Sequence, residues 1–109
     1  MNKLEDLLHM LGVTPNYKCY RQTLLATSLA VQQPDSLLLV TKRLYPAVAR
    51  EHRTTWHAVE RNIRLAVNIA WRCNPGLLSA LAGYQLEEKP TAAQFIAILA
   101  TGGMQTVGR

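Results

Sequence analysis

The sequence predicts one all-α domain, a compact bundle of about six helices that contains a helix-turn-helix. Three observations predict it: apolar residues recur at helical spacing, no segment alternates as a strand does, and Gly, Pro and Asn separate the helical segments. With 109 residues, 49% hydrophobic and 17% charged, the chain can bury one core and is not of disordered composition. We therefore treat residues 1–109 as a single domain.

The first third of the chain predicts two helices. Helical spacing relates Leu4, Leu7, Leu8 and Leu11, and Gly12 is suited to end that first helix. After a turn at residues 14–16, a second helix is expected over 17–31, because the residue before Pro34 disfavours helix. Its apolar face is expected to hold Tyr20, Leu24, Leu25, Ser28 and Val31.

A third helix is expected to begin at Asp35 or Ser36 and to lie centrally in the bundle. Its uncharged residues cover much of its circumference: Leu37, Leu38, Val40, Thr41, Leu44 and Tyr45. Pro46 then either kinks this helix or occupies the first turn of the next one, and both alternatives start a new segment there.

The last third predicts two helices separated by a loop. Asn74-Pro75-Gly76 breaks the chain, and a short helix follows that Gly83 closes. Its apolar residues are Leu77, Leu78, Leu81 and Ala82. After a loop at 84–89, a last helix is expected over about 91–101, with a frayed tail over 102–109 that begins at Gly102-Gly103.

Several classes of protein and site are not indicated. The longest apolar runs, 37–40 and 95–100, are far shorter than the ~20 residues of a membrane span. The N-terminus shows no basic segment followed by an apolar stretch, so we expect a cytoplasmic protein with no membrane partner. Cys19 and Cys73 stand apart, which favours two buried thiols over a metal site or a disulfide. We expect no cofactor and no metal.

The sequence also offers no catalytic arrangement. Its serines follow no nucleophile-elbow pattern, and its three histidines have no partner spacing. Glu87-Glu88 is better explained as a solvated loop than as an acid-base pair. We expect neither enzymatic activity nor a small-molecule substrate.

The formal net charge of +5 lies entirely within residues 42–72. That segment has seven basic residues against Glu51 and Glu60, whereas the rest of the chain has five of each sign. The seven are Lys42, Arg43, Arg50, Arg53, Arg61, Arg64 and Arg72. A basic surface concentrated on a small domain is typical of proteins that bind nucleic acid.

Residues 46–72 read as a helix-turn-helix. A small residue, Ala49, lets the second helix cross closely, the polar turn is His52-Arg53-Thr54, and Val59 packs back. Thr54 or Thr55 is expected to cap the long helix. Because the turn lacks glycine, Arg53 or a neighbour must adopt the conformation that it requires.

The long helix has two faces. At 100° per residue its apolar residues share one side: Val59, Ile63, Ala66, Val67, Ala70 and Trp71. Opposite them lies a basic stripe of His57, Arg61, Arg64, Asn68 and Arg72. The stripe could be merely solvated, but the turn and the confined charge favour nucleic acid as the partner. A helix-turn-helix would bind it as double-stranded DNA. For Trp56 we favour packing on the preceding helix over DNA contact, and for Trp71 a place in the core.

In this interpretation the N-terminal half of the long helix enters the major groove, where arginine binds guanine and glutamate accepts from cytosine. The base-reading candidates are His57, Glu60, Arg61 and Arg64. The phosphate candidates are Lys42, Arg43, Arg50, Arg53, Thr54, Thr55 and Asn68.

The chain also resembles a known family, the C-terminal DNA-binding effector domain of the master response regulator that initiates sporulation in endospore-forming bacteria. The resemblance extends from Leu7-Leu8-His9-Met10-Leu11-Gly12 to Phe95-Ile96-Ala97. Its most specific parts are Thr41-Lys42-Arg43-Leu44-Tyr45-Pro46-Ala47-Val48-Ala49, Val59-Glu60-Arg61-Asn62-Ile63-Arg64-Leu65-Ala66 with Ala70-Trp71, and Lys89-Pro90-Thr91.

The resemblance implies a six-helix domain that reads short, often tandem promoter elements in the nucleoid. It implies dimer contacts by the last helix, where Phe95, Ile96 and Leu99 are the candidates. The family motif typically reads Ser-Arg-Val-Glu-Arg, whereas this chain has His57-Ala58-Val59-Glu60-Arg61. By position Ala58 is therefore a further base-reading candidate, but it replaces an arginine expected to reach a base. Either His57 or Arg61 compensates or specificity is relaxed.

The family regulator carries a receiver domain ahead of this domain, whereas Met1 here lies almost directly before the first helix. The chain is therefore either an excised domain or a stand-alone protein, and the Met start favours the second. The alternative to a DNA-binding regulator is an interaction module that forms a homodimer, or binds and modulates a full-length response regulator, and binds DNA weakly.

Overall fold

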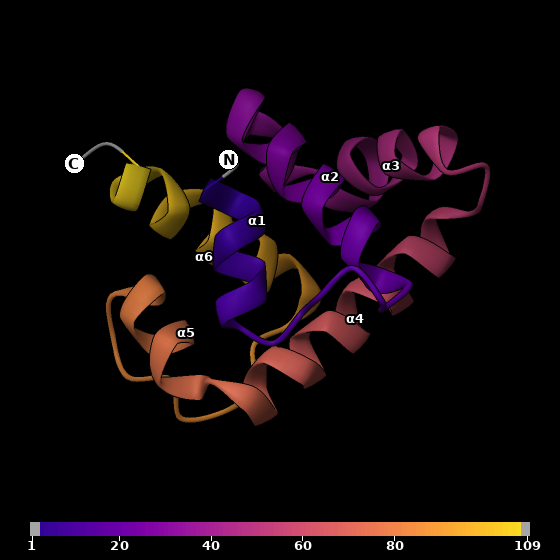
Figure 1. Ribbon diagram of the computed structural model, residues 1–109. Helices are drawn as coiled ribbons and strands as arrows, with labels where there is room; N and C mark the ends of the chain where they lie inside the picture. The colour runs from indigo at the N-terminus through magenta and orange to yellow at the C-terminus, as the bar shows by residue number, and fades with distance from the viewer. Residues whose placement is uncertain (1–2, 108–109) are drawn as a thin grey trace.

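The computed structural model describes residues 3–107, with side chains described as far as Gly102, and within this part it is all-α as the sequence predicts (Figure 1). Its α-helices are α1 (Lys3–Met10), α2 (Cys19–Gln32), α3 (Tyr45–Glu51), α4 (Trp56–Cys73), α5 (Pro75–Ala82) and α6 (Ala92–Val107). A 3₁₀ turn, η1 (Pro34–Leu38), and a π-helical turn, η2 (Val40–Leu44), connect α2 to α3.

The helix α2 contacts α1, α3, α4 and α6, so most of the bundle is assembled on it. Figure 1 shows α3 and α5 at opposite ends of the long helix α4. The largest fully buried side chains come from every α-helix except α2, and from η2 and the turn after α1: Leu8, Leu11, Val13, Leu44, Tyr45, Val48, Val59, Ile63, Leu78, Phe95, Ile96 and Leu99. One continuous core therefore supports α4 from behind.

The buried face of α2 differs from the predicted one. Its buried residues are small or hydroxyl-bearing apart from one ring: Cys19, Tyr20, Thr23, Ala26, Thr27 and Ala30. Of the residues expected on this face only Tyr20 is buried, while Leu24, Leu25 and Val31 pack half-buried at its margins. Small side chains let α4 and α6 approach the α2 backbone closely, and this preference outweighed the larger apolar area of the leucines.

The prediction of a single central helix that begins at Asp35 or Ser36 is wrong, because two short helical turns, η1 and η2, occupy this segment. Leu39 has a non-helical backbone (φ −137°, ψ 56°) that separates η1 from η2, and Leu38 is 81% exposed. The amide of Tyr45 donates to Val40 O, five residues back, immediately before Pro46 in the first turn of α3. Because proline lacks an amide proton and crowds the carbonyl four residues before it, a wider π turn is a natural way to enter α3.

Most predicted helix ends are confirmed. Gly12 follows α1 with φ +89°, and the Asn74 side chain caps α5 by accepting from the Leu77 amide at 3.2 Å. At the start of α6, Thr91 and Gln94 form a reciprocal capping box: each side chain accepts from the other's amide, at 3.1 and 2.8 Å.

The predicted end of the last helix is wrong. The helix α6 continues through Gly102-Gly103 to Val107, and only the last two residues of the expected frayed tail lie outside the described part. Gly102 is buried where α6 crosses α5, and a Cβ there would lie 2.8 Å from Leu81 O. This glycine allows close helix packing and does not end the helix.

The turn between α3 and α4 explains how the chain makes a helix-turn-helix without glycine. Arg53 has φ +52°, the only positive value among the described non-glycine residues. The Thr54 amide donates to Ala49 O at 2.9 Å and the Arg53 amide to Arg50 O at 3.4 Å, which is a Schellman arrangement around a left-handed residue. Arg53 thus occupies the strained position that the sequence predicted for it or a neighbour.

We expect Arg53→Gly to stabilise the fold by up to about 1 kcal/mol. The left-handed conformation costs an L-residue roughly 1–2 kcal/mol, and the greater conformational entropy of glycine in the unfolded state offsets part of the gain from removing that cost. Thermal unfolding should show a melting temperature a few degrees higher. Arg53→Ala is the matched control, since it removes the same charge but keeps the strain. Equal melting temperatures for the two variants would contradict the assignment of strain to Arg53.

A second stability prediction concerns the interior of α2. Thr23 Oγ1 is buried and has no hydrogen-bond partner in the described part of the chain, whereas Thr27 Oγ1 donates to Thr23 O at 2.8 Å. We expect Thr23→Val to stabilise the protein by about 1 kcal/mol, because an unsatisfied buried hydroxyl costs about 1–3 kcal/mol. Thr27→Val should be neutral or destabilising. Denaturant titrations in which Thr23→Val is the more damaging variant would refute this account.

Candidate nucleic-acid interface

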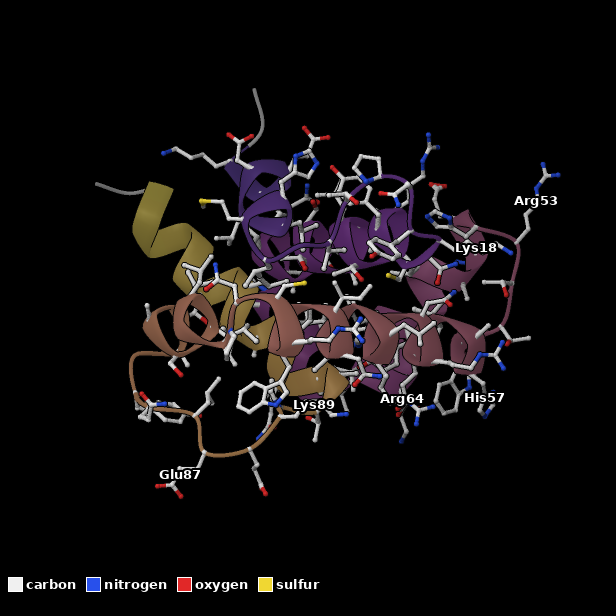
Figure 2. The ribbon with its side chains drawn as sticks, turned by 60° about the horizontal axis from the view of Figure 1, so that its bottom comes forward. Lys18, Arg53, His57, Arg64, Glu87 and Lys89 are labelled. Atoms are coloured by element: carbon white, nitrogen blue, oxygen red, sulfur yellow. The ribbon has the colours of Figure 1, made fainter. Side chains whose placement is uncertain are left out.

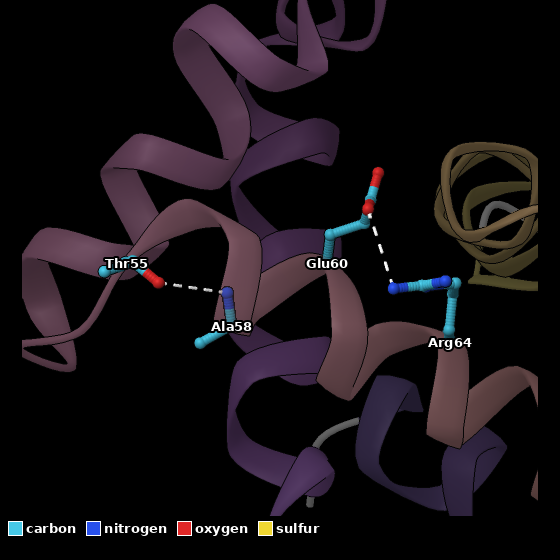
Figure 3. A network of polar contacts seen from close by, with 4 residues as sticks. All are labelled: Thr55, Ala58, Glu60 and Arg64. Carbon is cyan, nitrogen blue, oxygen red and sulfur yellow. Dashed lines mark hydrogen bonds and ion pairs between the residues drawn. The ribbon is translucent and has the colours of Figure 1, made fainter.

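The N-terminal end of α4 is organised by its cap. Thr55 has an extended backbone, and its Oγ1 accepts from the Ala58 amide at 3.1 Å (Figure 3). Of the predicted capping residues, Thr55 is the one that acts. The cap begins α4 directly after the turn at Arg53, so the first residues of α4 emerge at the exposed corner of the domain.

The two faces of α4 agree with the predicted wheel. Val59, Ile63, Ala66, Val67 and Ala70 are buried, together with Ile69, while Trp71 is half-buried against the core. All five residues of the basic stripe are exposed: His57, Arg61, Arg64, Asn68 and Arg72. The charged side chains are therefore free to meet a partner without disturbing the core.

The base-reading candidates occupy this exposed side at different depths. His57, Arg61 and Arg64 are exposed, whereas Ala58 and Glu60 are half-buried. The His57 ring stacks on the half-buried Trp56 ring, with centroids 3.8 Å apart. Trp56 also packs against the core, which agrees with the favoured packing role, and its contact with His57 limits where that imidazole can point.

Glu60 and Arg64 form an exposed ion pair along the helix, with 3.9 Å between Oε1 and Nη2 (Figure 3). Pairs of this kind contribute at most about 1 kcal/mol in water. Arg64 can therefore exchange Glu60 for another acceptor at little cost in free energy.

The predicted phosphate candidates lie on three neighbouring segments. Lys42, Arg43, Arg50, Arg53, Thr54 and Thr55 are all exposed on η2, α3 and the turn. Arg53 projects from the far corner of the turn (Figure 2). Asn68 differs from the rest, because its Oδ1 already accepts from Lys89 Nζ at 2.6 Å.

Lys89 is a residue of this surface that the sequence did not assign to it. It lies on the loop before α6, yet Figure 2 shows His57, Arg64 and Lys89 in a row along the same edge of the molecule. The sequence contained one signal, since Lys89-Pro90-Thr91 is among the specific parts of the resemblance, but nothing local indicated that it meets α4.

A groove of about 790 Å³ separates α4 from the start of α6. Its charged lining residues are Arg61, Arg64, Lys89 and Glu60. Three positive charges and one negative charge give the lining a formal net charge of +2. Tyr45 also lines it, and burial, with a smaller effect of Glu60, raises the pKa of this phenol to about 12. Tyr45 is therefore uncharged at neutral pH and does not diminish the positive potential.

The predicted dimer candidates do not lie on a surface. Phe95, Ile96 and Leu99 are fully buried in the core beneath α2 and α4, so the structure corrects their assignment. The apolar spacing that made them candidates is explained by packing within the monomer. A contact with a second copy or with another regulator would have to use other residues.

The two free cysteines differ in exposure. Cys19 is buried, and burial raises the pKa of its thiol, but Cys73 is exposed, contrary to expectation. Within residues 3–107 no helix is long and apolar enough to cross a membrane. The same residues contain no group of three or more His, Cys, Asp or Glu side chains that could hold a metal ion.

A family model matches most of the chain. The model described as "Sporulation initiation factor Spo0A C terminal" matches residues 4–102, from the first turn of α1 into α6. The match includes the whole helix-turn-helix and the loop that carries Lys89. Domains of this family are DNA-binding regulatory domains of sporulation. The chain therefore belongs to the family of C-terminal domains of the sporulation initiation factor Spo0A.

Proposed function

We propose that the protein is a sequence-preferring, double-stranded DNA-binding regulator of transcription in which the N-terminal half of α4 enters the major groove. The exposed stripe opposite the buried face of α4 carries this proposal. Residues 57–64 extend about 10 Å along the helix axis at 1.5 Å per residue. That length fits a major groove about 12 Å wide.

The roles follow from position. In this proposal Arg61 and Arg64, which are exposed, bind guanine edges, and Glu60, once Arg64 leaves it, accepts from a cytosine amine. Arg50, Arg53 and the amides at the start of α4 would bind phosphates on one side of the groove. A regulator of this kind works in the cytoplasm, on the nucleoid, and requires neither a cofactor nor catalysis.

The first test removes the central arginines. We expect Arg64→Ala or Arg61→Ala to weaken binding to a preferred duplex by about 1–3 kcal/mol and to relax selectivity at one base position. Fluorescence anisotropy across a salt series measures this, and Arg21→Ala, which removes an exposed arginine from α2, is the control. If the wild-type chain shows no salt-dependent binding to any duplex, the proposal is wrong.

The second test concerns Ala58, which is half-buried on the flank of α4 at the position where the family has an arginine. We expect Ala58→Arg to add a guanine preference at one position of the selected DNA sequence, because bidentate pairing discriminates by about 1–3 kcal/mol. Selection from a random duplex library, before and after the change, measures it.

Leu65→Arg is the matched control for that experiment. Leu65 is 49% exposed on the same flank of α4, two turns further along, so the variant adds the same charge beyond the reading residues. It should strengthen binding to all duplexes alike. If Ala58→Arg behaves like Leu65→Arg, position 58 does not read a base.

A further inference from the structure

We propose that Lys89 is a second, non-adjacent part of the DNA interface: it binds a backbone phosphate at the edge of the major groove, and Asn68 positions it there. This inference rests on the proposed function and extends it from the helix-turn-helix to the loop before α6. Its starting observation is the 2.6 Å hydrogen bond from Lys89 Nζ to Asn68 Oδ1.

The length of α4 determines where this lysine lies. The helix has 18 residues and is therefore about 27 Å long, more than twice the width of the major groove. If residues 57–64 occupy the groove, Asn68 lies about 6 Å beyond Arg64 along the axis. That distance takes it out of the base-reading region to the groove edge, where the phosphates of one strand are found.

The chemistry of the Lys89–Asn68 pair favours phosphate over a base. The ammonium group of lysine is a compact cation with three donors, and Asn68 Oδ1 satisfies one of them. The remaining donors and the full charge are available to an anion. Asn68 is therefore a positioning residue for Lys89, which replaces its predicted role as a direct phosphate contact.

The surroundings support an anion at this place. Arg64 lines the same groove as Lys89, and the groove continues to Ala92 and Ala93 in the first turn of α6. Their amides precede the first intrahelical hydrogen bond of α6, so they contribute partial positive charge. Glu60 is the only carboxylate lining the groove within the described residues, and Glu87 projects away from it at the tip of the loop (Figure 2).

The test compares Lys89→Gln with Lys18→Gln. Both remove one exposed lysine, but Lys18 lies on the other side of α4 from the row of His57, Arg64 and Lys89 (Figure 2). Anisotropy titrations over a range of salt concentrations would use the duplex that the wild-type chain selects and a scrambled duplex of the same length.

For Lys89→Gln we expect the slope of log K against log salt to fall in magnitude by about 0.9, with binding roughly fivefold to tenfold weaker at ~0.1 M salt for both duplexes. Lys89→Arg should retain the slope, and Lys18→Gln should match the wild type. An unchanged slope in Lys89→Gln, while the wild type binds DNA, overturns the inference but leaves the proposed function intact. A wild type that binds no duplex overturns the proposed function itself.

The role of Asn68 is tested by a double-mutant cycle. Asn68→Ala alone should weaken binding by less than Lys89→Gln, because the lysine remains but is less well held. In the Lys89→Gln background, Asn68→Ala should have no further effect. Equal losses in both backgrounds would show that Asn68 does not act through Lys89 and would overturn the positioning role.

Discussion

The structure depends on the packing of one face of α4 against the core beneath α2 and α6. Burial of Val59, Ile63, Ala66 and Val67 fixes the rotation of α4 about its axis, so the opposite face must be exposed. The direction of the basic stripe is thus a consequence of core packing. A weaker core contact would let the helix rotate and misdirect every candidate base contact at once.

Core packing determines the rotation of α4, and the turn before α4 determines the residue at which the helix begins. Thr55 caps it, and Arg53 accepts a left-handed backbone that glycine would adopt more easily. An arginine at this position places a cation at the exposed corner beside the start of the helix. The left-handed backbone lowers stability locally, and in the proposed function the same side chain binds a phosphate.

The surface around α4 is made by segments far apart in the sequence. Lys89 donates a hydrogen bond to Asn68, which lies 21 positions earlier in the sequence. Both residues line the groove, together with residues of η2, α3, α4 and the start of α6. In the proposed complex, the helix-turn-helix supplies the base contacts and the phosphate contacts at one edge of the major groove. The loop before α6 supplies the phosphate contact at the other edge. The domain would then hold both edges of the groove with one rigid core behind them.

The sequence by itself determined the all-α class, most helix ends, the two faces of α4, a threonine cap at Thr54 or Thr55 and the need for an unusual residue in the turn. These features arise from spacing and capping within about four residues, so they can be read locally. Only the tertiary structure decided the break at Leu39, the small-residue face of α2, the continuation of α6 through Gly102, the burial of Phe95, Ile96 and Leu99, and the meeting of Lys89 with Asn68. Each of these depends on which surface a distant segment covers, and apolar spacing alone cannot distinguish a face buried in the monomer from one available to a partner.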